Sequence, residues 1–173
     1  MNLLIVVDYQ KDFVDGALGF DGAELLDEKI AQKIDEYHKN GDNVVFTLDT
    51  HNENYFDTQE GRKLPVKHCI KGSEGHKLFG KTANAVGKDD IFFEKPCFPS
   101  LDLANYLRDK DYQKIELLGL VSNICVISNA VMAKAALPEA EIIVDASCTD
   151  SFDKTLNDKC LDILEGLQIT VIR

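Results

Sequence analysis

Three reactive side chains in this sequence, Asp8, Lys95 and Cys125, each come after a short run of apolar residues. A cysteine in the first turn of a helix can act as a nucleophile, because the helix dipole and the free N–H groups lower the pKa of its thiol. A nearby aspartate can take the thiol proton and pass it to a leaving amine, and a lysine can stabilise the charges that form. The same N–H groups can hold an oxyanion, so the set predicts covalent hydrolysis of an amide. Taken singly, each residue also fits an ordinary role as a buried inert cysteine, a cap aspartate or a solvated lysine.

A second set of side chains, Asp49, His51 and His68, has the residue types that bind divalent metal ions. Asp49 and His51 lie two positions apart, which puts both side chains on one face of an extended segment. With or without Glu60, which lies between the two histidines in the sequence, the set suits Zn²⁺, Mn²⁺ or Fe²⁺. Because Asp-x-His is short and common, ordinary polar groups of a loop remain the open alternative from spacing alone.

An alternation of short β-branched runs with longer helical stretches must position these side chains. Strands are expected at 3–7, 43–48, 90–93, 114–118, 141–144 and 168–172, and helices at 23–39, 100–110, 123–137 and 153–165. Asn40-Gly41 indicates the end of the first helix, and Ser100 is the expected N-cap of the second. The segment 50–89 is rich in Gly, Asn, Asp, His and Lys, and is expected to be a long irregular loop with a functional role.

This alternation predicts a six-stranded parallel sheet with right-handed crossovers, in a three-layer α/β/α, Rossmann-like fold. No internal repeat or linker interrupts it, so residues 1–173 are expected to form a single domain. In such sheets the functional site lies beyond the carboxyl ends of the strands. Sequence spacing cannot bring Asp8, Lys95 and Cys125 together, but the fold can, because the first, third and fourth strands are expected to lie side by side in a doubly wound sheet.

The composition narrows the class of protein further. The 19 basic and 30 acidic residues give a formal net charge of −11, which argues against a nucleic-acid-binding or anionic-membrane-binding surface. No apolar run approaches the roughly 18 residues of a membrane span, and the first ten residues do not resemble a signal peptide. The cysteine count is odd and no CxxC occurs, which favours a reducing, cytoplasmic location. The other four thiols are interpreted as structural: Cys69, Cys97, Cys148 and Cys160.

Four linked motifs resemble one known family, the isochorismatase-like cysteine hydrolases, and in particular its nicotinamidase branch. LLIVVDYQKDF is similar to the family's strand followed by D-x-Q-x-D-F, and GLVSNICV to its nucleophile segment. FEKPCFPS is similar to the segment that supplies the lysine, and LDTHNENYF with PVKHCIKGSEG to the metal-binding pair D-x-H and P-x-H-C-x-x-G. The motifs follow the family order over nearly the whole chain.

The resemblance implies a role for each of these residues. It implies a catalytic triad of Asp8, Lys95 and Cys125, and metal ligands Asp49, His51 and His68, with Glu60 as the candidate fourth ligand. The metal is expected to be zinc, with iron or manganese as alternatives. The resemblance also implies a cis peptide bond between Leu120 and Val121, an oxyanion hole from the N–H groups of Val121 and Cys125, and packing of Phe13 on the substrate ring.

The implied activity is that of a nicotinamidase, which converts nicotinamide to nicotinate and ammonia through a cysteine thioester. Other hydrolases of the superfamily, acting on a different small amide, a carbamoyl or ureido compound or isochorismate, are the main alternative, and a non-catalytic metal-binding protein is another. Two departures from the family pattern bear on the substrate: Val66-Lys67 lacks the tryptophan often found there, and Asn123 replaces a frequent aspartate. The resemblance also implies a homo-oligomer, whose interface the apolar helix at 123–137 could help to bury.

Overall fold

Six parallel strands form the centre of the computed structural model, which describes residues 1–173. Their order across the sheet is β3-β2-β1-β4-β5-β6. The strands are β1 (Asn2–Val7), β2 (Asn43–Asp49), β3 (Ile91–Lys95), β4 (Lys114–Leu120), β5 (Glu141–Asp150) and β6 (Thr170–Ile172). The helices and helical turns are α1 (Lys11–Val14), η1 (Ala23–Leu26), α2 (Asp27–Lys39), η2 (Tyr55–Asp57), α3 (Gln59–Lys63), α4 (Gly80–Asn84), α5 (Leu101–Arg108), η3 (Ser122–Val126), α6 (Ile127–Ala136) and α7 (Lys154–Gly166). The predicted three-layer α/β fold with a six-stranded parallel sheet is thus confirmed.

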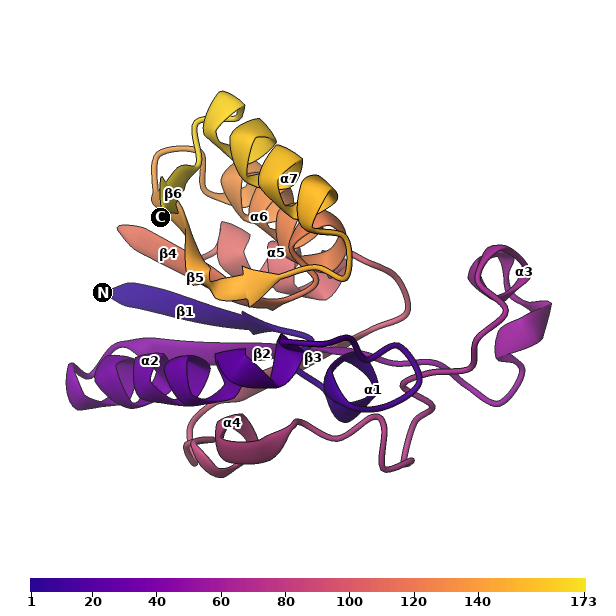
Figure 1. Cartoon of the computed structure of the whole chain (residues 1–173). Coiled ribbons are helices and arrows are strands. Elements are labelled where there is room, and N and C mark those ends of the chain that lie inside the picture. The colour runs from indigo at the N-terminus through magenta and orange to yellow at the C-terminus, as the bar shows by residue number, and fades with distance from the viewer.

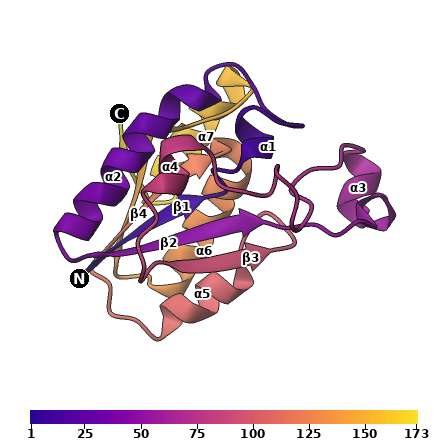
Figure 2. The same cartoon turned by 90° about the horizontal axis from the view of Figure 1, so that it is seen from below.

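Helices cover both faces of this sheet. In Figure 1, α2 and α4 lie below the sheet, and α5, α6 and α7 lie above it. Figure 2, seen from below, shows β3, β2 and β1 side by side in that order. The strands run toward the end of the molecule where α1 and α3 lie, and α3 projects beyond that end (Figure 1). The carboxyl ends of the strands therefore open onto loops rather than onto the packed helices.

The continuous apolar run of β1 is explained by burial on both faces. Leu3, Ile5 and Val7 belong to the cluster that packs with α5, α6 and α7, whereas Leu4 and Val6 belong to the cluster that packs with α2. Side chains alternate between the faces of a strand, so a strand between two helical layers must be apolar throughout. Each fully buried side chain of this size contributes about 1.5–3 kcal/mol. This anchoring holds the carboxyl end of β1, and hence Asp8, in place.

Local capping residues set the ends of several elements. Ser100 accepts a hydrogen bond from the N–H of Leu103 at 3.1 Å, which confirms it as the N-cap of α5. Gly41, with a φ of 73°, follows α2 and adopts the left-handed conformation expected after a helix C-terminus. Thr58 caps α3 by accepting from the N–H of Gly61 at 3.0 Å. These caps fix where the helices begin and end, and therefore where the loops at the strand ends begin.

Two expectations about the layout were wrong. β2 lies between β3 and β1, so the first, third and fourth strands are not adjacent, and the side chain of Lys95 must extend past the end of β2 to reach Asp8. The segment 50–89 is not irregular throughout, because it contains η2, α3 and α4. These helices are too short, at three to five residues, to show an apolar periodicity in the sequence.

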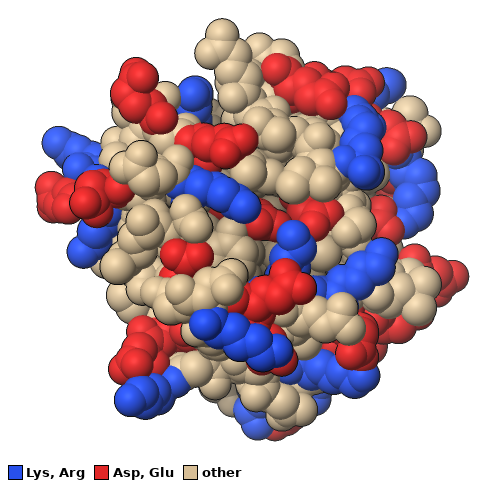
Figure 3. Space-filling view, turned by 90° about the vertical axis from the view of Figure 1, so that its left-hand side faces the viewer, with Lys and Arg blue, Asp and Glu red and all other residues tan.

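On the face that carries both chain termini, acidic and basic side chains are intermixed, without a continuous basic area (Figure 3). No helix of this chain has both the length and the apolar character needed to cross a membrane.

Candidate active site

The ammonium group of Lys95, the last residue of β3, lies at the centre of the candidate site. Its Nζ is 2.6 Å from Asp8 Oδ2, 3.5 Å from Asp49 Oδ1 and 3.6 Å from Cys125 Sγ. It also donates a hydrogen bond to the carbonyl oxygen of Cys97 at 3.0 Å. Burial alone would lower the pKa of Lys95, but the negative charges around it outweigh this effect and raise the pKa above its ordinary value. Lys95 is therefore a fixed positive charge that contacts both sets of predicted site residues.

Asp8, directly after β1, is fully buried and is held by its neighbours on both sides. Thr47 of β2 donates its hydroxyl to Asp8 Oδ1 at 2.6 Å. On the other side, β4 approaches so closely that a Cβ on Gly119 would lie 2.1 Å from the carbonyl oxygen of Val7. Burial raises the pKa of Asp8, and the charge of Lys95 offsets this only in part. The carboxylate is thus a stronger base than an aspartate in water, as a proton acceptor requires.

Cys125 lies in η3, a π-helical turn between β4 and α6. The wider turn is seen in the hydrogen bond from the N–H of Val126 to the carbonyl oxygen of Val121, five residues earlier, at 3.2 Å. The carbonyl oxygen of Cys125 accepts a hydrogen bond from Asn129 Nδ2 of α6 at 2.8 Å, which ties the turn to the helix. The peptide bond between Leu120 and Val121 is cis, as the resemblance implied.

The expectation that the position of Cys125 at the start of a helix lowers the pKa of its thiol was wrong. Burial, together with the charge of Asp8, raises the pKa of Cys125 well above its ordinary value, and the charge of Lys95 opposes this without reversing it. The prediction considered the helix dipole and omitted desolvation, which is the larger effect for a thiol only 6% exposed. The thiol therefore holds its proton more tightly than a cysteine in water, and a neighbouring base is needed to remove it.

The predicted metal ligands Asp49, His51 and His68 converge at the carboxyl end of β2. One ligand atom from each lies within 4.8 Å of the others. Asp49 Oδ2 is 3.0 Å from His51 Nε2 and 3.2 Å from His68 Nε2. His68 Nδ1 is 2.8 Å from the carbonyl oxygen of Val66, and a proton on Nδ1 donated to that oxygen leaves Nε2 free to bind a metal.

Glu60 of α3 completes this group. Its Oε1 lies 3.6 Å from the Nε2 atoms of both His51 and His68. Burial and the charge of Asp49 raise the pKa of Glu60. For Asp49 itself burial would also raise the pKa, but hydrogen bonds from the two histidines and the charge of Lys95 hold it below its usual range. Two carboxylates and two imidazoles facing one buried point fit a divalent cation, which would balance the paired acidic groups.

Gln10 is a candidate positioning residue that sequence reasoning missed, although it belongs to the D-x-Q-x-D-F motif. Its fully buried side chain accepts from the N–H of Asp49 at 2.8 Å and donates to the carbonyl oxygen of Asp49 at 2.9 Å. The same amide donates to the carbonyl oxygen of His76 at 2.9 Å. Gln10 therefore positions the backbone of a predicted metal ligand relative to the end of β1, two residues from Asp8. The sequence motif includes Gln10, but only the fold shows which residues Gln10 contacts.

Replacing Gln10 by glutamate is expected to weaken metal binding by about 10–100-fold, the usual effect of losing a partner that orients a ligand. Glutamate has the same size but cannot donate to the carbonyl oxygens of Asp49 and His76. Titration of the purified variant with zinc measures the affinity, and Gln113→Glu, at an exposed glutamine, is the matched control. An unchanged zinc affinity in Gln10→Glu would show that the hydrogen bonds of Gln10 do not position Asp49.

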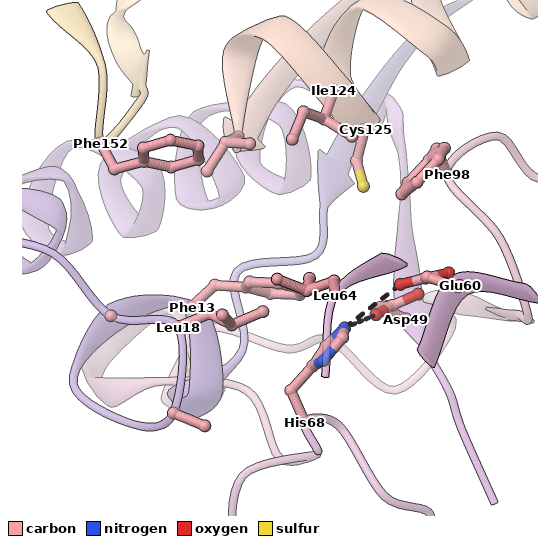
Figure 4. Close-up of a pocket in the computed structure, with 13 residues that line it drawn as sticks. Phe13, Leu18, Asp49, Glu60, Leu64, His68, Phe98, Ile124, Cys125 and Phe152 are labelled. Carbon is pink, nitrogen blue, oxygen red and sulfur yellow. Dashed lines mark ion pairs between the residues drawn. The ribbon is translucent and has the colours of Figure 1, made fainter. Parts of the chain in front are cut away.

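One cavity of about 490 Å³ joins the two sets of residues. Cys125, Asp49, Glu60 and His68 all line it, and nine of its thirteen lining residues are hydrophobic. Phe13 lines it as well, with its ring centroid 5.6 Å from that of His68. Figure 4 shows the sulfur of Cys125 directed into the space between Phe13 and the metal-ligand side chains. Cys125, supported from behind by Asp8 and Lys95, shares this apolar cavity with metal ligands, and such a site can bind and hydrolyse a small, flat amide.

Comparison with known proteins gives similarity over nearly the whole chain. Residues 2–173 match the family model of the isochorismatase domain. The uncharacterized isochorismatase family protein PncA of Bacillus subtilis strain 168 is 35% identical over 141 residues, covering 75% of this chain and 76% of that protein. The structure of a pyrazinamidase/nicotinamidase from Streptococcus mutans UA159 aligns with a TM-score of 0.89 and 29% identity, covering 99% of this chain and 100% of the other. A pyrazinamidase of Pyrococcus horikoshii in complex with zinc aligns with a TM-score of 0.87 and 22% identity, covering 99% and 98% of the two chains.

Proposed function

The chain belongs to the isochorismatase family, and we propose that it is a nicotinamidase that hydrolyses nicotinamide to nicotinate and ammonia. The observation that carries this proposal is the shared cavity, in which Cys125 faces the candidate metal ligands across an apolar space. The likeness to the nicotinamidase structure of Streptococcus mutans supports the same activity. The intact arrangement of Asp8, Lys95 and Cys125 favours a catalytic protein over a metal-binding protein without activity.

In the proposed mechanism, Asp8 takes the proton of the Cys125 thiol as the sulfur attacks the carboxamide carbon. Lys95 stays protonated. Its positive charge stabilises the negative charge both when that charge is on the carboxylate of Asp8 and when it is on the sulfur of Cys125. The N–H groups of Val121 and Cys125 are assigned to hold the oxyanion. The carbon–nitrogen bond then breaks, and ammonia leaves with the proton held by Asp8. Water, activated by the same carboxylate, hydrolyses the thioester to nicotinate and restores the thiol.

We assign Asp49, His51, His68 and Glu60 to hold a divalent metal. When bound, such a cation accepts the lone pair of the pyridine nitrogen and so orients the ring, which is a templating role. Zinc is the proposed metal, supported by the mixed carboxylate and imidazole donors and by the zinc in the Pyrococcus horikoshii pyrazinamidase. The same donors also suit iron and manganese.

The apolar cavity also distinguishes this activity from that of related hydrolases. A carbamoyl or ureido substrate presents several hydrogen-bonding groups, and burying them unpaired is costly. Apart from Cys125, only Asp49, Glu60 and His68 line the cavity with polar side chains, and all three belong to the candidate metal site. An aromatic amide therefore fits the lining better than a ureido compound does.

The direct test measures ammonia release from nicotinamide by the purified chain, before and after chelation. We expect turnover in the untreated protein, loss after chelation, and recovery when zinc, iron or manganese is added back. An N-carbamoyl amino acid is the comparison substrate and is expected to be a poor one. Efficient release of ammonia from that compound, with none from nicotinamide, would replace the proposed function by a carbamoyl hydrolase activity.

Cytoplasmic location and assembly into a homo-oligomer stay predictions. The helix considered for an interface, α6, uses Ala130 and Ala133 in the core of its own chain. Val131 on the same helix is 42% exposed and is available to a second copy.

A further inference from the structure

The cavity is larger than the proposed substrate. Nicotinamide has about nine non-hydrogen atoms, and if each takes at most the volume of a water molecule, about 30 Å³, the ring and its amide fill at most about 270 Å³. The cavity measures about 490 Å³. A substantial part of it therefore stays free when the carboxamide is at Cys125.

The free volume lies on the side of Cys125 away from Asp49 and Glu60. Figure 4 shows Phe152 and Leu18 on one side of Cys125, and Asp49 and Glu60 on the other. A ring held between the thiol and the metal ligands occupies the second side. The first side, lined by residues of the loop between α1 and η1 and of the loop between β5 and α7, remains open to a substituent on the ring.

Small residues create this space. Ala17 and Gly19 flank Leu18 in the cavity wall. A Cβ on Gly19 would lie 2.6 Å from the carbonyl oxygen of Val14, so the backbone is packed too closely there for a larger residue. Ala17 is exposed to solvent, so its side chain can be enlarged without displacing buried core residues.

The residues that line this side of the cavity favour an apolar ring substituent over a polar one. On this side the lining consists of Phe13, Leu18, Ala17, Gly19 and Phe152, none of which carries a charge or a side-chain hydrogen-bonding group. Phe152 is 61% exposed, so a substituent packed against its ring would remove apolar surface from water. A charged or strongly polar substituent would lose water without gaining a partner.

We propose that the side of the cavity formed by Ala17, Leu18 and Phe152 is a subsite for a small apolar ring substituent. The chain then hydrolyses alkyl-substituted pyridine carboxamides as well as nicotinamide, and Ala17 and Phe152 determine this specificity. The inference rests on the proposed function, because it needs the carboxamide at Cys125 and the ring nitrogen toward the metal ligands. The ring carbon meta to both groups, position 5, faces the free side.

The test compares kcat/KM for nicotinamide, 5-ethylnicotinamide and 5-carboxynicotinamide, in the wild-type chain with its metal and in Ala17→Leu. We expect the wild type to hydrolyse the ethyl compound at a rate within about tenfold of nicotinamide, and the carboxy compound at least about tenfold more slowly than the ethyl one. In Ala17→Leu the ratio of ethyl compound to nicotinamide should fall by about 10–100-fold, since added methylenes fill the subsite. Ala135→Leu, at an exposed alanine of α6, should leave the ratio unchanged.

The outcomes separate this inference from the proposed function. Hydrolysis of nicotinamide with rejection of the ethyl compound would overturn the subsite alone. An equal loss for both substrates in Ala17→Leu, or equal rates for the ethyl and carboxy compounds, would also overturn it. No hydrolysis of any of the three amides would overturn the proposed function, and the subsite with it.

Discussion

Replacing Cys125 by alanine is expected to lower kcat for nicotinamide by at least about 10⁴-fold, the scale seen when a covalent nucleophile is removed. The variant should still bind the substrate and the metal, because alanine leaves Asp49, His51 and His68 unchanged. Steady-state ammonia release measures the first effect, and equilibrium binding of nicotinamide to the metal-loaded variant measures the second. An acid-quenched reaction of the wild type should carry an acyl group on Cys125, which mass spectrometry detects.

A matched control separates chemistry from packing. Cys148 on β5 is also buried, at 1% exposure, and does not line the cavity. Cys148→Ala removes the same atoms from the interior and should retain most of the activity. If both variants lost activity equally, or if Cys125→Ala kept it, Cys125 would be a structural thiol and the proposed mechanism would be wrong.

Replacing Lys95 by methionine is expected to abolish turnover and also to destabilise the fold by about 3–5 kcal/mol, the usual cost of removing one partner of a buried ion pair. In the wild type, Lys95 Nζ lies 2.6 Å from Asp8 Oδ2. Methionine keeps the length of the side chain but removes this charge, so Asp8 stays buried without a positive partner. Denaturant unfolding measures the stability. Lys88→Met, at a solvated lysine, is the control and should change stability by less than about 1 kcal/mol.

The loss of stability in Lys95→Met should depend on pH in a defined direction. Burial already raises the pKa of Asp8 in the folded wild type, and loss of the lysine charge raises it further. In the unfolded chain the same carboxyl titrates near its ordinary value of about 3.9. Between these two values the folded state binds the extra proton, so the variant loses stability as pH rises from about 4 through the raised folded pKa. Its deficit relative to the wild type should be larger at pH 8 than at pH 5.

A deficit that is equal at both pH values would show that Asp8 does not titrate in this range. A deficit that grows toward low pH would contradict the assignment of Asp8 as the group left unpaired. The second result would require another buried group as the main partner of Lys95.

Much of the fold could be predicted because its signals are local. The unbroken apolar run of β1, the cap at Ser100 and the Asn40-Gly41 stop depend on the pleat and the helix ends, which neighbouring residues determine. The short helices η2, α3 and α4 could not be predicted in the same way, because they are positioned by packing around the strand ends. The order of the strands was also inaccessible, since apolar runs of similar character do not identify their neighbours.

By itself, the sequence determined the alternation that makes the parallel sheet, the family resemblance, and the residue types of the candidate site. Only the tertiary structure decided that Lys95 crosses the end of β2 to reach Asp8, that Gln10 clamps Asp49, and that the cavity extends to Phe152. It also reversed the expected pKa of the Cys125 thiol. The physical reason is the same in each case: side-chain type and spacing are local properties, whereas desolvation, charge proximity and cavity shape depend on residues that are distant in the sequence.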